Sequence, residues 1–271
     1  SIFTNVFDIS MTTPTAMDIC TRVGDKALPE YKKLKEEIKQ AKAVNGDETS
    51  AKLNGLPGWL WGFFSVNIAL FVFNKERGGD IIDRILGKGF KGILGCDGWS
   101  TYKIFAEKLG LPLQRCWAHA IREVKELCMN KKRKNKSLEK AYGWFCDIFE
   151  QVKKARAIKS QEKREQLYLE LITELDRWCQ VYSAYTPLRK IVNKIRNGKE
   201  YWFTCVLHPE IEPTNNFAER MLRTWVVFRK IIGCLRSKKG EETTETMLSL
   251  FSTWKLRKLH PYLELKSLLG A

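Results

Sequence analysis

The chain has 271 residues, 44% of them apolar and 29% charged, and it carries a net charge of +16. Nine Trp, fourteen Phe and eight Tyr supply enough apolar surface for a hydrophobic core, which excludes a disordered chain. The longest apolar run, residues 59–73, is shorter than the roughly 18 residues of a membrane-spanning helix, and the first residues lack a signal-peptide pattern. The basic excess indicates a polyanionic partner such as nucleic acid.

The basic charge is concentrated in the second half of the chain. Residues 121–200 carry a net charge of +9 and residues 213–271 carry +6, whereas the remaining residues are close to neutral. A single cluster of this kind is equally typical of a solvated helix face. The distribution therefore predicts which segments meet an anion, if one is bound.

The first half of the chain predicts alternating helices and strands. An amphipathic helix is expected over 26–42, and the aromatic run 59–73 predicts two buried strands that turn near Asn67. Around and after them we expect a strand near 44–53, a helix from 80, a strand over 92–96, a helix over 101–109, a strand over 111–117 and a helix from 118.

The next seventy residues predict helices only. Three apolar stripes, over 138–152, 167–182 and 188–195, have helical spacing, and a further helix is expected to start near 213–215. This order indicates an α/β domain with an all-helical insertion, in which residues before 125 and after 213 share one core. We expect a helical N-terminal segment (1–43), a first part of the core (44–125), the insertion (126–212), and a core helix with a basic C-terminal segment (213–271).

Three acidic residues lie where a metal site could form. Asp47 is in a candidate strand, Asp97 ends another, and Glu219 is in the first turns of the helix after 213. Phosphoryl transfer by two metal ions needs hard oxygen ligands that converge from different elements. With 31 acidic residues in the chain, the same spacing also fits a plain turn at Asp97 and a surface ion pair between Glu219 and Arg223.

Six motifs, in order, resemble those of DDE transposases of the insertion-sequence-66 family. They are GDET (46–49), RGGD (77–80), CDGWSTY (96–102), QRCWAHAIRE (114–123), TNNFAERMLR (214–223) and FRKIIGCLRSKKGEE (228–242). The resemblance implies an RNase H-like mixed sheet flanked by helices. It also implies that Asp47, Asp97 and Glu219 are the catalytic residues and metal ligands, whereas Glu48 points to the other face of its strand.

The resemblance further implies chemistry and partners. The expected reactions are endonucleolytic cleavage at the ends of a mobile element and attack of the freed 3′-OH on target DNA, with two Mg²⁺ or Mn²⁺ ions present when DNA is bound. Expected partners are double-stranded DNA and, on DNA, a second copy of the chain, in the cytoplasm at the nucleoid. The resemblance also implies DNA-recognition regions upstream, of which residues 1–42 would be the end.

Two other functions fit the same sequence. One is an RNase H-like metal-dependent nuclease that cuts DNA without joining it. The other is an inactive DNA-binding remnant of a transposase. The three intact acids argue against the remnant, because such clustered acids are costly to keep without a function.

Contacts with DNA are expected around the same motifs. The candidate residues are His119, Arg122, Trp202, Asn215, Asn216, Arg220, Arg223, Arg229, Lys230, Arg236 and Lys238. The basic side chains among them would contact phosphates, and Trp202 would stack on a base. Zinc is not expected, since Cys116 and His119 have no second ligand pair at suitable spacing and the eight cysteines form no CxxC motif.

Overall fold

A computed structural model describes residues 10–129 and 135–270. Its centre is one five-stranded mixed sheet with the strand order β3-β2-β1-β4-β5. The strands are β1 (Ala43–Leu53), β2 (Leu56–Phe64), β3 (Ala69–Asn74), β4 (Ile93–Cys96) and β5 (Leu113–Arg115). The first three pair antiparallel in sequence order, whereas β4 runs parallel to β1 and β5 runs parallel to β4.

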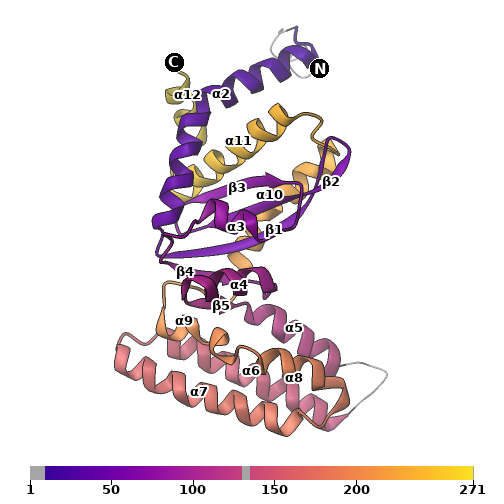
Figure 1. The fold of residues 1–271 in the computed structure, drawn as a ribbon, viewed down its shortest axis with the longest axis vertical. Helices are drawn as coiled ribbons and strands as arrows, with labels where there is room; N and C mark the ends of the chain where they lie inside the picture. Colours follow the sequence, from indigo (N-terminus) through magenta and orange to yellow (C-terminus); the bar gives the residue numbers. More distant parts are fainter. Residues whose placement is uncertain (1–9, 130–134, 271) are drawn as a thin grey trace.

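The helices fall into two groups (Figure 1). The group around the sheet is α2 (Thr13–Glu37), α3 (Asp80–Ile85), α4 (Ser100–Leu109), α10 (Asn216–Ile232), α11 (Lys238–Leu256) and α12 (Pro261–Leu269). The second group is a helical block of α5 (Trp117–Cys128), α6 (Lys136–Arg156), α7 (Gln161–Tyr182), α8 (Arg189–Arg196) and α9 (Thr204–Leu207). The predicted α/β class, a mixed sheet flanked by helices, is confirmed, and the strand order is consistent with an RNase H-like fold.

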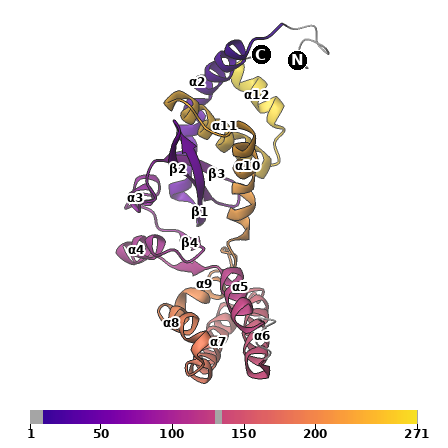
Figure 2. The same cartoon turned by 90° about the vertical axis from the view of Figure 1, so that its right-hand side faces the viewer.

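The alternation of side chains along β1 separates the two faces of the sheet. Val44 belongs to the hydrophobic cluster under α2, α3 and α4, whereas Ala51 and Leu53 belong to the cluster under α10. Figure 2 shows α3 and α4 on one side of the sheet and α10 on the other. Any polar residue of β1 therefore faces either α4 or α10, according to its position in the strand.

Residues that precede the helical block in the sequence share one core with residues that follow it. The cluster on the α10 face combines Ala51 and Phe73 of the sheet with Leu222 and Trp225 of α10. The rings of Phe73 and Trp225 meet edge to face at 5.0 Å. Burial of such large side chains stabilises the position of α10 on the sheet.

The structure differs from the sequence prediction at the strand expected over 111–117. β5 ends at Arg115, and Trp117 is the first residue of α5. The ring of Trp117 lies 5.3 Å from that of Phe145, so this residue belongs to the core of the helical block. The block therefore begins at Trp117, and the domain division predicted at 125, which stays a prediction, falls inside α5.

Side chains of α2 and α11 cover the outer edge of β3. The backbone N–H groups of Phe73, Phe71 and Ala69 donate to Glu245 Oε2 (2.9 Å), Ser249 Oγ (2.9 Å) and Thr253 Oγ1 (3.0 Å). Successive acceptors are four residues apart on a helix, a spacing of about 6 Å along the helix axis. Successive donors are two residues apart on a strand, a spacing of about 6.7 Å, so each donor lies opposite an acceptor. Tyr31 of α2 donates to the Phe71 carbonyl at 2.9 Å. The edge is therefore satisfied without another strand.

We expect Ser249→Ala to lower the free energy of unfolding by about 1–3 kcal/mol, because the buried Phe71 N–H loses its acceptor. Ser252→Ala is the matched control, since Ser252 is also buried on α11 and makes no hydrogen bond to β3 within the described residues. Chemical denaturation measures both. Equal losses in the two variants would contradict a specific role for the edge contact.

Candidate active site

Asp47 and Glu48 lie on opposite faces of β1. On the α10 face, Asn45 donates to Asn215 Oδ1 at 2.9 Å and Thr49 accepts from Arg229 at 3.0 Å, so Asp47 between them faces α10. On the other face, Glu48 accepts from Arg77 Nη2 at 2.6 Å. This is the arrangement that strand alternation predicts, with Asp47 on the face of the helix that carries Glu219.

Asp97 follows β4, which lies directly beside β1. The parallel register pairs Ala43 with Ile93 and Asn45 with Gly95, and two further residues along each strand bring Asp97 next to Asp47. Neighbouring strands are about 4.8 Å apart. The backbone N–H of Trp99 donates to Asp97 Oδ1 at 2.9 Å, which fixes the carboxylate at the strand end.

Glu219 is positioned by Asn215, the residue before α10. The Asn215 amide donates to the Gly46 carbonyl at 3.0 Å, and its oxygen accepts from Asn45. Gly46 must lack a side chain, since a Cβ there would lie 2.4 Å from the Tyr102 ring. Glu219 follows one helical turn later, and its N–H donates to the Asn215 carbonyl at 3.1 Å. The start of α10 is thus fixed to the backbone next to Asp47.

The carboxylates lie close enough to perturb one another. Burial, together with the negative charges of Asp97, Glu48 and Glu219, raises the pKa of Asp47 to about 7, although the Glu48 N–H donates to it. Like charges disfavour the ionised form of a carboxyl group. The structure therefore places Asp47 and Asp97 on adjacent strands and Glu219 on the helix whose start is bonded to β1, and the charges of Asp97 and Glu219 both act on Asp47.

These residues fit divalent cations. Glu219 Oε1 is buried without a hydrogen-bond partner among the described residues, and His119 Nε2 is 3.7 Å away, too far for a hydrogen bond. A cation would both satisfy this oxygen and neutralise the charge that raises the pKa of Asp47. Carboxylate oxygens are the ligands that Mg²⁺ and Mn²⁺ prefer.

A different ligand set overlaps this site. The Cys116 thiol, the His119 imidazole and the Glu219 carboxylate place one ligand atom each within 4.8 Å of one another. Burial raises the pKa of the Cys116 thiol, and its sulfur already accepts the Asn215 N–H at 3.1 Å. Zinc binds the thiolate and takes about four ligands, so this cluster is the weaker metal site.

The sequence pattern of the family described as "Transposase IS66 family" matches residues 1–243. The chain belongs to the IS66 family of transposases. Membership implies that the chain binds DNA, and the match includes all three acids and all six motifs. No curated protein matches the sequence. No helix in the described part of the transposase is both long and apolar enough to cross a membrane.

Most predicted DNA-contacting residues of the transposase are accessible. His119 and Arg122 line a hollow of about 390 Å³ beside Asp97. Six side chains are solvent-exposed, namely those of Arg122, Asn216, Arg220, Arg223, Lys230 and Arg236, and Lys238 at the start of α11 is exposed as well. The hollow and the exposed face of α10 are therefore the surfaces on which DNA could approach the acids.

The structure corrects the expected roles of Trp202 and Asn215. Trp202 is 2% exposed, and its ring packs 5.6 Å from Trp117 in the core of the helical block, so it cannot stack on a base without leaving that core. Asn215 is 1% exposed and bonded on both sides. Arg229 is partly committed too, because it donates to Thr49 and to Ser50 Oγ at 2.8 Å. These three residues hold the structure together.

Arg77 and Lys194 were not predicted as site residues, yet both line the hollow beside Asp97. Lys194 of α8 forms an ion pair with Glu123 of α5 at 2.7 Å. The sequence signal that could have identified Arg77 is the position of Glu48. Strand alternation puts this acid on the far face of β1, and an acid buried there needs a cationic partner. The arginine of the RGGD motif is that partner.

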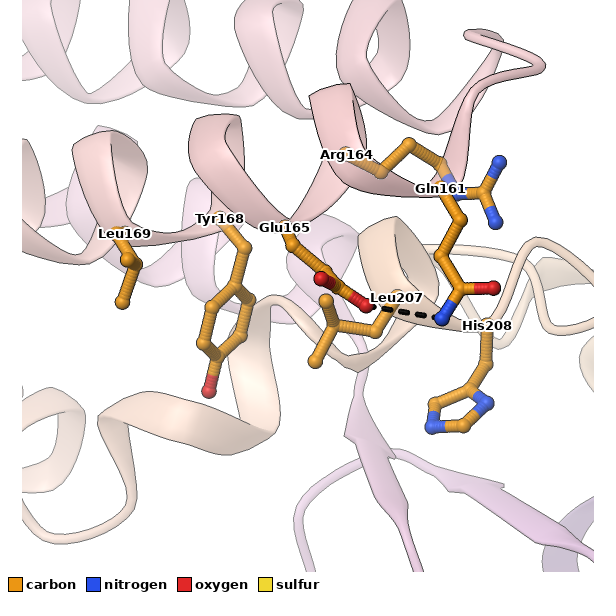
Figure 3. A pocket seen from close by; sticks show the side chains of 7 residues that line it. All are labelled: Gln161, Arg164, Glu165, Tyr168, Leu169, Leu207 and His208. Atoms are coloured by element: carbon orange, nitrogen blue, oxygen red, sulfur yellow. Dashed lines mark hydrogen bonds between the residues drawn. The ribbon is translucent and has the colours of Figure 1, made fainter.

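A second hollow lies in the helical block, away from the acids (Figure 3). Its walls are Gln161, Arg164 and Tyr168 of α7 with Leu207 and His208, and Gln161 donates to Glu165 across one helical turn at 2.9 Å. None of the predicted site residues lines it. The hollow therefore adds nothing to the candidate active site.

We expect metal-free protein to lose stability as the pH rises from 3.8 to about 7, since folding raises the Asp47 pKa over this range. Below this window Asp47 is protonated in both states, and above it the folded protein holds the charge at a cost on the order of 4 kcal/mol. Asp47→Asn should remove this part of the pH dependence. Unfolding curves measured across the window test it, and identical slopes for both proteins would contradict the assignment.

Proposed function

We propose that this chain is a DNA transposase that cleaves transposon ends and joins them to target DNA, with Asp47, Asp97 and Glu219 as ligands of two Mg²⁺ or Mn²⁺ ions. The observation that carries the proposal is the placement of Asp47 and Asp97 on adjacent parallel strands, with Glu219 on the helix that Asn215 bonds to β1. Membership of a transposase family supports DNA as the substrate.

The side chains act by holding reactants in place. When bound, the ions would activate the attacking oxygen and stabilise the leaving one. In cleavage a water oxygen bonds to phosphorus, the phosphorus–O3′ bond breaks, and the proton lost by the water is replaced by one that the leaving O3′ takes up from solvent. In joining, the oxygen of the freed 3′-OH bonds to a phosphorus of the target strand and gives up its proton to solvent, while the phosphorus–O3′ bond of the target breaks and its O3′ takes up a proton. The metal ligands would stay fixed during both steps, because Asp47 and Asp97 lie on adjacent strands and Glu219 is held through Asn215.

The DNA path in this proposal follows the exposed basic side chains near the acids. Arg220, Arg223 and Lys230 extend along α10, and Arg236 and Lys238 continue at its end. His119 and Arg122 approach from the hollow. Contacts of this kind supply affinity without sequence specificity. We further propose that the helical insertion adds a basic surface, and that two copies act together on DNA at the nucleoid.

We expect Asp97→Asn to reduce Mg²⁺-dependent cleavage and joining of transposon-end DNA at least about a hundredfold, because a ligand of the ions is lost. Asp83→Asn, a partly exposed change on α3 on the face of the sheet away from α10, is the control and should leave both activities unchanged. A strand-transfer assay on gels measures both steps.

The assay also separates the other functions. Cleavage without joining would favour the nuclease, and DNA binding without either activity would favour the inactive remnant. Activity that survives Asp97→Asn would contradict the assignment of the metal ligands.

A further inference from the structure

Arg77 is held from three sides. Its guanidinium lies over two indole rings, 4.7 Å from the centroid of Trp59 and 4.5 Å from that of Trp99. Its Nε and Nη2 both donate to Glu48 Oε1, at 2.9 and 2.6 Å. An arginine stacked and bonded in this way has lost most of its rotational freedom before any ligand arrives.

The partner of Arg77 is a buried acid. The Glu48 side chain is 2% exposed, and Tyr102 donates to its second oxygen at 3.3 Å. A buried carboxylate without a nearby cation is destabilising. The ion pair therefore stabilises the charged form of Glu48 and also holds Arg77 in place. Because Glu48 neighbours Asp47 on β1, the pair ties Arg77 to the strand that carries the first acid.

Part of the guanidinium remains available. The Arg77 side chain is 42% exposed, and Glu48 engages only Nε and Nη2, so the Nη1 donors make no hydrogen bond to a described residue. Arg77 lines the hollow together with Asp97, His119 and Arg122. Trp99, whose ring stacks on Arg77, also donates its N–H to Asp97. The partly exposed Arg77 side chain thus lies at the same hollow as Asp97.

We propose that Arg77 binds a phosphate of the DNA strand that enters this hollow beside Asp97. A guanidinium matches phosphate oxygens in charge and geometry, and one that is fixed beforehand loses little entropy on binding. The inference rests on the proposed function, because that function supplies DNA as the ligand. It adds a substrate-binding residue at the acids, on the sheet side of the hollow rather than on α10.

The test is the salt dependence of DNA binding without divalent cations, so that no cleavage contributes. Loss of one phosphate contact makes the slope of the logarithm of the binding constant K against the logarithm of the salt concentration less negative by about 0.9. It also weakens binding roughly tenfold at low salt. We expect this for Arg77→Met with a short DNA duplex. Arg77→Lys should keep the slope, because the charge remains, but should bind more weakly, because the planar fork is lost.

Arg84→Met is the matched control, since Arg84 is an exposed arginine on α3 close by in sequence and outside the hollow. It should keep the wild-type slope. Thermal melting shows whether each variant is folded. A wild-type slope in folded Arg77→Met, or the same change in Arg84→Met, would overturn the proposal. Failure of the proposed function shows instead in the strand-transfer assay, which this measurement does not use.

Discussion

The placement of three partly buried carboxyl groups around one end of β1 is the constraint on which the site depends. Burial, and after it the negative charges of Asp97, Glu48 and Glu219, raise the pKa of Asp47 to about 7, so the scaffold must hold these groups in place against both costs. The scaffold uses three fixed attachments: the parallel register of β1 and β4, the Trp99 N–H on Asp97, and Asn215 between α10 and β1. The fourth nearby acid, Glu48, forms an ion pair with Arg77 on the opposite face.

The helical insertion leaves and rejoins the sheet without disturbing this site. Where the chain departs, the Trp117 N–H donates to the carbonyl of Pro213, and the Asn215 N–H donates to Cys116 Sγ. The two ends of the insertion are therefore joined directly in front of the acids. At the β5 edge, Thr204 of α9 donates to the Leu113 carbonyl at 2.5 Å. Both edges of the sheet are thus covered by side chains, at β3 by α11 and at β5 by the returning segment.

Alternation and helical period predicted the sheet, the helices and the face of β1 that carries Asp47, because these depend on local patterns. What they missed depends on contacts far apart in sequence. Trp202 falls off the helical period because Lys199–Trp202 is a 3-10 helix, with about three residues per turn, and not because it faces solvent. Asn215 resembled a DNA contact because no local signal shows that Asn45 and Gly46 lie across from it. The role of Arg77 could not be predicted either, because it depends on the burial of Glu48, which the local sequence does not show.

The central claim is that Asp47, Asp97 and Glu219 together hold divalent cations. Anomalous X-ray diffraction from Mn²⁺-soaked crystals of the DNA complex tests it most directly. The account predicts two manganese peaks about 4 Å apart, each in contact with at least one of the three carboxylates. Manganese bound elsewhere, or only at Cys116 and His119, with the three carboxylates left without metal, would contradict it.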